Sequence, residues 1–514
     1  MLFRSLLFLI AILVAQAAHA LDPSLVKGLA GDNDAKIAAI GEIAATGDPE
    51  ALVVLKQMAD GELKVDGEEI VVNNRVRREI EGAMAALRLV SPDREARLAA
   101  AKGLAGGADE SMNADPVGGN PRLPLVKKAL SRESDPAIKA ILQHIAATME
   151  LRSADKAVRI AAIQTLGESS DPNMKLLLLP LLEKTSEGKY VEADEDVRGA
   201  AQKSLAAVEG RAAWAGRVGL LFSGVSLGSI LLLAALGLAI TYGLMGVINM
   251  AHGELIMIGA YTTYVVQNLF RAHLPGAFDY YLALAVPMSF AASALVGMAL
   301  ERSVIRWLYG RPLETLLATW GISLVLIQAV RTLFGAQNVQ VENPSFMSGG
   351  LEILAGVVLP WSRIMIIAFA ALVLAAVGLL LARTRLGLFV RGVTQNRAMA
   401  ACVGVHTARV DTWAFGLGSG IAGLAGCALS QIGNVGPDLG QSYIVDSFMV
   451  VVLGGVGQLA GTVYAALGLG FANKLLETWQ GAVIAKIVVL VFIIVFIQKR
   501  PQGLFALKGR AVET

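Results

Sequence analysis

The sequence predicts an all-α protein in which a polytopic helical membrane domain of about eight to nine spans follows an exported α-helical domain. Three observations predict this organisation. Of the 514 residues, 55% are hydrophobic and only 17% are charged, whereas an ordinary soluble domain has about 25% charged residues. Apolar runs of spanning length begin near residue 216. Before that point, charged residues recur among apolar residues at helical spacing.

Residues 1–20, MLFRSLLFLIAILVAQAAHA, are predicted to be a cleavable signal peptide. A lone Arg4 precedes an apolar core that is too short for a bilayer core of roughly 30 Å, and the small-residue end AHA suits signal peptidase. An uncleaved anchor helix is the alternative. In both cases the segment that follows begins outside the cytoplasm.

Residues 21–215 are expected to form an extracytoplasmic α-helical, repeat-like domain. DNDAKIAAIGEIAATGD, SPDREARLAAAKGLAGG, SADKAVRIAAIQTLGE and DEDVRGAAQKSLAAVEG each place Asp or Ser before a helix that contains paired alanines. Such side chains cap the free N–H groups of a first helical turn. The units resemble HEAT-type repeats, which bury their apolar sides by stacking. This domain is either a docking surface for an extracytoplasmic partner or a plain helical spacer.

Residues 216–507 are expected to form a transmembrane permease domain, with residues 508–514 as a cytoplasmic tail. Apolar runs predict spans at about 219–242, 254–270, 280–300, 313–333, 363–382, 411–432 and 483–498. The chain must enter and leave the stretch 443–472 on the same side of the membrane, so that the arginine-rich links and the C-terminal end all face the cytoplasm. This stretch contains a predicted membrane helix break, which forms either a re-entrant hairpin or two short crossings. The break consists of Gly454, Gly455, Gly457 and Gly461.

Positive charges give the expected orientation, because Lys and Arg collect on the cytoplasmic side of membrane proteins. The links ERSVIRWLYGRP and ARTRLGLFVRGVTQNRAMAACVGVHTARV are rich in arginine, and Lys499 and Arg500 follow the last span. These segments are therefore expected inside. The links 271–279 and 334–362 are expected outside.

The polar trio Asn249, His252 and Glu254 interrupts an apolar region, GLMGVINMAHGELIMIGAY. An ionisable residue in a bilayer costs about 2.5 to 3.5 kcal/mol on insertion scales, so the trio either lines a polar solute route or forms a tight cytoplasmic turn capped by Asn249. The expected orientation places it at the inner end of the first two spans. Gln328 is a further candidate for lining the route.

Two other segments are candidate contact sites. FVRGVTQNRAMAACVGVHTARV has the pattern of a short amphipathic helix on the inner face, and it either meets a cytoplasmic subunit or is an ordinary interfacial loop. NVGPDLGQSYIVDSF is expected to be an exposed outer loop. Asp438 and Asp446 in this loop are either partner contacts or, more commonly beside Gly and Pro, turn residues.

Composition argues against several function classes. Two cysteines and five scattered histidines predict neither a disulfide scaffold in the exported domain nor a Cys/His metal site. His252 and Glu254 are the only candidate acid–base pair. They lie two residues apart without a nucleophile, so no catalytic residues are expected. There is no phosphate-binding loop of the G-x-x-x-x-G-K-[ST] type and no basic face for nucleic acid.

Several motifs resemble the permease subunits of branched-chain amino acid ABC transporters. They are TYGLMGVINMAHGELIMIGAYTTY, TRLGLFVRGVTQNRAMAACVGV, GLGSGIAGLAGCAL and VVLGGVGQLAGTVYAALGLG. With its signal sequence and helical N-terminal third, the chain is similar, more narrowly, to urea ABC transporter permeases, whose members carry such an extension.

This resemblance implies an importer in the inner membrane that is fed by an extracytoplasmic solute-binding protein. It also implies a second homologous permease and two cytoplasmic ATPase subunits that hold the ATP, with no cofactor on this chain. The polar trio would lie beside the translocation route. The ATPase-coupling segment would comprise Arg391, Gln395, Asn396, Arg397, Ala400 and Gly404.

The expected solute is urea or a related small neutral amide. Branched-chain or other amino acids are the alternative, since their charged groups would favour opposite charges or helix ends along the route. A hypothesis from another class is a passive channel with an extracytoplasmic sensory domain.

Overall fold

A computed structural model describes residues 23–505 except 47–48, 66–67, 71, 90, 112–122, 170, 187, 247 and 355–356. The predicted signal peptide and the predicted tail 508–514 lie outside the described residues. The chain divides into two compact units, Met1–Trp214 and Ala215–Thr514. The division falls within the long helix α11 (Glu195–Met245), close to the composition change near residue 216.

The described part of the N-terminal unit is mostly helical, with a short antiparallel pair of β1 (Lys64–Val65) and β2 (Glu68–Glu69) and an isolated antiparallel bridge between Lys184 and Tyr190. Its helices are α2 (Pro23–Gly28), α3 (Asn33–Thr46), α4 (Pro49–Asp60), α5 (Asn74–Arg88), α6 (Arg94–Ser111), α7 (Leu123–Arg132), α8 (Pro136–Glu150), α9 (Lys156–Glu168), α10 (Met174–Leu178) and η1 (Leu179–Leu182), followed by the start of α11.

A local clamp recurs where helices of this unit begin. An aspartate accepts hydrogen bonds from first-turn N–H groups, and an arginine four residues later donates to two carbonyl groups just before the aspartate. The pairs are Asp93 with Arg97, Asp155 with Arg159, and Asp194 with Arg198. The repeated sequence pattern therefore corresponds to a repeated local structure.

Apolar clusters follow one another along this unit. One contains Leu29, Ile40 and Ile80; the next contains Leu104, Val126 and Leu142; a third contains Leu151, Ile163 and Val197. Ion pairs tie two helices to links that follow, since Arg97 of α6 pairs with Glu133 before α8 at 2.8 Å, and Arg159 of α9 pairs with Glu192 before α11 at 3.2 Å. Each part of the unit thus packs mainly on its sequence neighbours.

The membrane unit is a helical bundle, and the prediction of an all-α polytopic membrane protein is confirmed. Its helices after α11 are α12 (His252–His273), η2 (Pro275–Tyr280), α13 (Tyr281–Ser303), η3 (Ile305–Leu308), α14 (Pro312–Phe334), η4 (Ser345–Met347), α15 (Trp361–Arg383), α16 (Arg385–Gln395), α17 (Arg397–Cys402), α18 (Thr407–Ser430), α19 (Leu439–Gly454), α20 (Leu459–Gln480) and α21 (Ala482–Lys499).

Seven helical segments within the described residues are long and apolar enough to cross a membrane. They are formed by α11, η2 with α13, α14, α15, α18, α20 and α21. Helix α19 is apolar but has only 16 residues. Helix α12 has 22 residues but is not among these seven, so the predicted eight to nine spans are reached only when α12 and α19 are counted as well.

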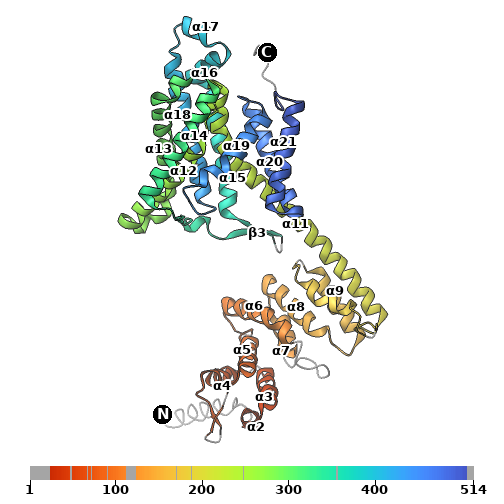
Figure 1. The fold of residues 1–514 in the computed structure, drawn as a ribbon. Helices are drawn as coiled ribbons and strands as arrows, with labels where there is room; N and C mark the ends of the chain where they lie inside the picture. Colours follow the sequence, from red (N-terminus) through yellow and green to blue (C-terminus); the bar gives the residue numbers. More distant parts are fainter. Residues whose placement is uncertain are drawn as a thin grey trace, which may run out of the picture. The chain divides into compact units, whose positions relative to one another are not determined.

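Helix α18 is almost entirely buried, and it packs against α12 and α13 (Figure 1). Its small residues permit this contact. A Cβ atom on Gly423 would lie 2.4 Å from the Ser289 carbonyl oxygen of α13, and one on Gly259 of α12 would lie 2.1 Å from the Gly423 carbonyl oxygen. The backbones of the three helices are therefore held at a separation that larger side chains would not allow.

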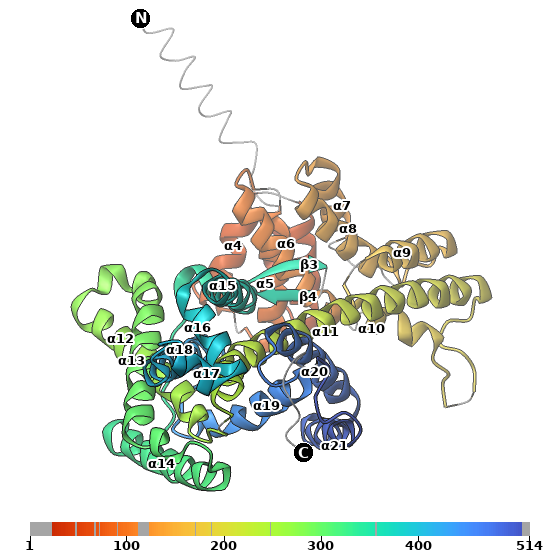
Figure 2. The same cartoon turned by 90° about the horizontal axis from the view of Figure 1, so that it is seen from above.

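The two ends of the membrane unit differ. Helices α16 and α17 lie at one end, and the antiparallel hairpin of β3 (Gly350–Leu354) and β4 (Val357–Pro360) lies at the other (Figure 1). We call the first the arginine-rich end, because α16, α17 and the residues beside them include Arg383, Arg385, Arg391, Arg397 and Arg409. Arg302 lies at this end too, since it contacts Thr412 near the start of α18, and so does the link that holds Arg306 and Arg311, since Tyr309 in that link contacts Arg397. Figure 2 shows α12, α13 and α14 on one side of the unit and α20 and α21 on the other.

Candidate solute pathway and coupling segment

The polar trio lies at the start of α12 and is buried, with exposed fractions of 2% for Asn249, 0% for His252 and 2% for Glu254. Asn249 Oδ1 accepts the Ala251 N–H at 3.0 Å and so caps the turn that leads into the helix. His252 Nε2 lies 2.9 Å from the Ala234 carbonyl oxygen of α11. The Glu254 carboxylate instead accepts a hydrogen bond from another helix, α14. The trio therefore connects the start of α12 to both α11 and α14.

The depth of the trio corrects the sequence-based placement at the inner end of the first two spans. The partner of Glu254 is the Ser323 hydroxyl, at 2.7 Å, and Ser323 lies in the middle of α14. The Ala234 carbonyl likewise lies well before the end of α11. After α11 ends, the chain therefore turns back into the bundle, so that α12 begins beside the middle of neighbouring spans. Sequence reasoning missed this because the return depends on contacts between distant residues.

The first turns of α12 and α19 touch backbone to backbone. A Cβ atom on Gly253 would lie 2.6 Å from the Gly440 carbonyl oxygen, and one on Gly440 would lie 2.1 Å from that of Gly253. Both residues immediately follow the first residue of their helix. Helix N-termini present N–H groups and a partial positive charge, so two such ends meet in the interior of the bundle.

Two polar atoms of the trio have no hydrogen-bond partner among the described residues. They are Asn249 Nδ2 and His252 Nδ1, and both are buried. Buried polar atoms are nearly always paired, and exceptions are often functional. The unpaired Asn249 amide is a hydrogen-bond donor within the same segment as the Glu254 carboxylate, which accepts hydrogen bonds.

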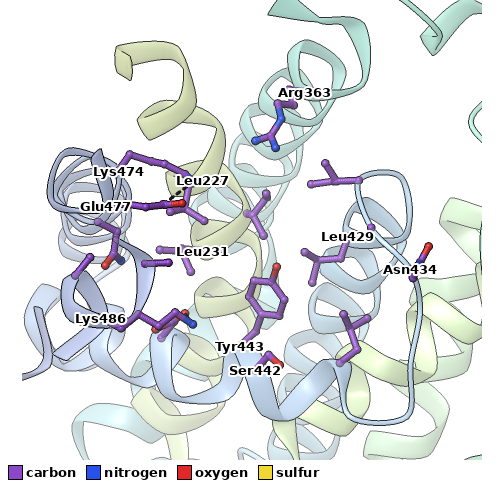
Figure 3. A pocket seen from close by; sticks show the side chains of 18 residues that line it. Leu227, Leu231, Arg363, Leu429, Asn434, Ser442, Tyr443, Lys474, Glu477 and Lys486 are labelled. Atoms are coloured by element: carbon purple, nitrogen blue, oxygen red, sulfur yellow. Dashed lines mark hydrogen bonds and ion pairs between the residues drawn. The ribbon is translucent and has the colours of Figure 1, made fainter. Parts of the chain in front are cut away.

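An open cavity of about 540 Å³ lies among α11, α15, α18, α19, α20 and α21. Figure 3 shows the Tyr443 side chain reaching into the space between Leu231 and Leu429. Tyr443 belongs to α19, the helix whose first turn touches α12 at Gly253. Helix α19 therefore connects the cavity wall to the segment that contains the trio, although the trio itself does not line this cavity.

Charged residues of both signs line the cavity, and most of them pair with one another. The Lys486 ammonium lies 3.7 Å from the Asp446 carboxylate, and Lys474 lies 2.7 Å from Glu477 (Figure 3 shows the second pair dashed). Arg363 also lines the cavity, with its guanidinium 3.4 Å from the Ser226 hydroxyl. The lining thus combines paired charges with the neutral hydroxyl of Tyr443.

Sequence reasoning did not single out Lys486, Arg363 or Tyr443 as site residues. The available signal was a lone lysine within an apolar helix, because such a residue usually faces a cavity or a partner. Asp446 was expected in an exposed outer loop, but α19 already begins at Leu439 and the Asp446 side chain is only 13% exposed. Asp438, which directly precedes α19, pairs with Arg331 at 2.7 Å.

Gln328 does not lie with the trio. Its side chain is on the exposed face of α14, whereas Ser323, which contacts Glu254, is on the buried face. The two positions are separated by more than one helical turn and point differently. The structure therefore does not bring Gln328 together with the trio, and its role in lining a route stays a prediction.

The predicted coupling segment is two helices rather than one. Asn396 adopts an extended conformation (φ −154°, ψ 101°) between α16 and α17, and its side chain accepts the Met399 N–H at 2.9 Å. Of the six predicted residues, Ala400 is buried, whereas Arg391, Gln395, Asn396, Arg397 and Gly404 are exposed. Gly404 has φ +89°, a conformation that favours glycine.

The stretch 443–472 breaks in the predicted glycine cluster. Helix α19 ends at Gly454, and Gly455 and Gly457 have φ values of +100° and +79° before α20 begins. A Cβ atom on Gly461 would lie 1.9 Å from the Gly454 carbonyl oxygen, so the two helices cross with their backbones in contact. The stretch is a hairpin of a 16-residue helix and a 22-residue helix.

Comparisons with known proteins agree on the membrane unit. The family model described as "Branched-chain amino acid transport system / permease component" matches residues 220–497. The high-affinity branched-chain amino acid transport system permease protein BraD of Pseudomonas aeruginosa is 28% identical over 290 residues, which cover 55% of this chain and 94% of BraD. The similarly named LivH of Escherichia coli is 28% identical over 297 residues, with the same coverage.

A more distant similarity is with the ribose import permease protein RbsC of Escherichia coli, at 30% identity over 102 residues, or 18% of this chain and 32% of RbsC. No solved structure matches the chain. The family match covers more than half of the sequence and most of the membrane unit. This chain therefore belongs to the family of branched-chain amino acid transport system permease components.

Proposed function

We propose that this protein is the permease subunit of an ABC importer that carries urea or a related small amide across the inner membrane. Membership of the permease family supports the transport role. The observation that carries the narrower proposal is the N-terminal helical unit. The family match begins only at residue 220, and the chain is similar to urea permeases in having such an extension.

The chemistry of the cavity also suits a neutral solute. Asp446 pairs with Lys486 and Glu477 pairs with Lys474, so most of its charges are compensated within the chain. Urea has no net charge, donates through two amino groups and accepts through one carbonyl oxygen. Hydroxyl groups such as that of Tyr443 can serve both needs.

The interior segment offers a complementary set of groups. The Glu254 carboxylate can accept an N–H of an amide, and the Asn249 amide can donate to its carbonyl oxygen. The two helix N-termini that meet at Gly253 and Gly440 also favour an oxygen with partial negative charge. We therefore propose that the solute passes from the cavity along α19 to the segment around the trio.

Branched-chain amino acids are the second candidate, because BraD and LivH are named for their transport. Asp446 and Lys486 could separate to bind the amino and carboxylate groups of such a solute. This alternative requires the ion pair to open, whereas a neutral amide leaves it intact.

The assembly that we propose places the arginine-rich end in the cytoplasm, where the segment from Arg391 to Gly404 would meet two ATPase subunits that bind ATP. A second homologous permease would complete the membrane pathway. An extracytoplasmic solute-binding protein would deliver the solute, with the N-terminal unit as a docking surface.

Uptake by the purified complex in proteoliposomes tests the proposal. We expect ATP-dependent uptake of labelled urea in the presence of the binding protein. Leucine uptake without urea uptake would replace urea by the amino acid alternative. Urea uptake without ATP in vesicles that contain this chain alone would instead show a passive channel.

A further inference from the structure

A buried charged cluster at the arginine-rich end joins the predicted coupling segment to the membrane helices. The Arg397 guanidinium pairs with the carboxylate of Asp411, whose side chain is completely buried. Arg397 is the first residue of α17, and Asp411 lies near the start of α18. The guanidinium also lies over the Tyr309 ring, 5.1 Å from its centre. One side chain of α17 therefore contacts both α18 and the link between η3 and α14.

A second carboxylate extends the cluster. Glu301, near the end of α13, is completely buried and accepts hydrogen bonds from the hydroxyl groups of Tyr309 at 2.9 Å and Thr412 at 2.6 Å. The sulfur of Met245, the last residue of α11, lies 3.2 Å from the Tyr309 hydroxyl. Three membrane helices and α17 therefore meet around Tyr309.

Simple attachment of the coupling segment would not require these charges. Ala400 of α17 already packs into an apolar cluster with Val410 and Ala414 of α18. Burying a carboxylate is costly unless it is paired, and Asp411 Oδ1 has no hydrogen-bond partner among the described residues. Arg397, in contrast, is 42% exposed, so water can solvate its guanidinium when the pair opens. The pair thus joins a completely buried carboxylate to a half-exposed guanidinium.

The other end of the connection leads to the proposed solute route. Helix α18 carries Gly423, which contacts the backbone of Gly259 in α12, and α12 begins with the segment that contains His252 and Glu254. A displacement of the start of α18 would therefore be transmitted to α12 through close-packed backbones, without a flexible side chain between them.

We infer that Arg397 and Asp411 are positioning residues that couple movement of α17 to the membrane helices. In this role the pair links ATP hydrolysis on the partner subunits to rearrangement of α18 and α12. The inference rests on the proposed function, because it requires ATPase subunits that act on the segment from Arg391 to Gly404. It goes beyond that function because it assigns the coupling between α17 and the membrane helices to one ion pair.

The test uses the whole transporter in proteoliposomes and measures uptake of labelled urea and ATP hydrolysis in the same vesicles. The variants are Arg397→Gln, Arg397→Lys and Asp411→Asn. Arg311→Gln is the matched control, because Arg311 forms an exposed pair with Glu314 at the same end of the unit. Co-purification of the ATPase subunits measures assembly separately.

We expect Arg397→Gln and Asp411→Asn to assemble and to hydrolyse ATP, with uptake per ATP lowered about fivefold or more. Arg397→Lys, which keeps the charge, should recover most of this ratio, and Arg311→Gln should not change it. An unchanged ratio in both Arg397→Gln and Asp411→Asn would overturn the inference. So would failure of both to assemble while Arg311→Gln assembles, because the pair would then be structural. Absence of ATP-dependent uptake in the unmodified transporter would count against the proposed function instead.

Discussion

The carboxylate of Glu254, at the start of α12, accepts a 2.7 Å hydrogen bond from the hydroxyl of Ser323, in the middle of α14. This contact fixes the polar segment within the bundle instead of at its surface. Since Glu254 is 2% exposed, its polarity serves contacts inside the protein or along a solute route.

Glu254→Ala should reduce solute uptake by about tenfold while the protein still accumulates in the membrane. The variant lacks the carboxylate that would accept a hydrogen bond from the solute, and a hydrogen bond to a charged group contributes about 1.5 to 3 kcal/mol. Uptake of labelled urea by the reconstituted transporter is the measurement. Ser323→Ala is the matched control, since it removes the same hydrogen bond and leaves the carboxylate. If Glu254→Ala transports normally, the residue has only a structural role.

Neutralising one member of the cavity ion pair should impair transport more than neutralising both. Asp446→Asn leaves the Lys486 ammonium without its partner, and Lys486→Met leaves the carboxylate alone, whereas the double variant contains neither charge. For a neutral solute we expect the double variant to keep most of its urea uptake. A double variant that transports no better than either single variant would favour a solute that binds these charges directly.

Gly253→Ala should lower the amount of folded protein. The added methyl group would lie 2.6 Å from the Gly440 carbonyl oxygen, and overpacking of this kind costs about 1 to 3 kcal/mol. Thermal stability in detergent, measured by size-exclusion chromatography after heating, reports the loss. Gly378→Ala is the control, because nothing lies within 4 Å of a Cβ atom at that position in α15. Equal stability of the two variants would show that the α12 and α19 backbones are not held together there.

Gly404→Pro should abolish solute-stimulated ATP hydrolysis. Proline cannot adopt the φ of +89° and lacks the N–H that Gly404 donates to the Ala401 carbonyl at 3.1 Å. Gly404→Asn is the control, because asparagine tolerates positive φ and a Cβ atom at this position would meet no atom within 4 Å. Hydrolysis by the assembled transporter should survive the asparagine change. An unaffected rate in the proline variant would remove Gly404 from the coupling segment.

The N-terminal unit should lose stability in acid through Glu133. The hydrogen bond from Arg97 holds the pKa of Glu133 below its ordinary value of 4.5. A carboxyl group whose pKa is lower in the folded state stabilises the fold above its unfolded pKa, and this contribution disappears as the pH falls through the folded pKa.

Hydrogen exchange across α6 to α8, measured in the full-length protein, checks this expectation. Glu133→Gln is compared with the unmodified protein at each pH, which cancels the intrinsic pH dependence of exchange. The extra protection of the unmodified protein should be complete at neutral pH and shrink below about pH 4.5. Protection that is independent of pH would show that the pair contributes nothing.

Much of the architecture could be predicted because it depends on local composition. Apolar runs located spans such as α14 and α15 to within a few residues, since a bilayer selects length and hydropathy. The glycine cluster at Gly454 predicted a helix break, because its residues permit backbone conformations that others resist. The predicted loop around Asp446 failed because a short buried helix such as α19 lacks the length signal of a span.

The sequence by itself determined the membrane class, the helical nature of both units, and the polar trio as an exception within apolar surroundings, because each follows from the transfer of side chains between water and lipid. Only the tertiary structure decided that Glu254 lies beside Ser323, that α12 and α19 meet at Gly253 and Gly440, and that Arg397 pairs with Asp411. The first two contacts join residues far apart in the chain, and the third joins two helices across a turn. Close packing of several helices at once determines all three.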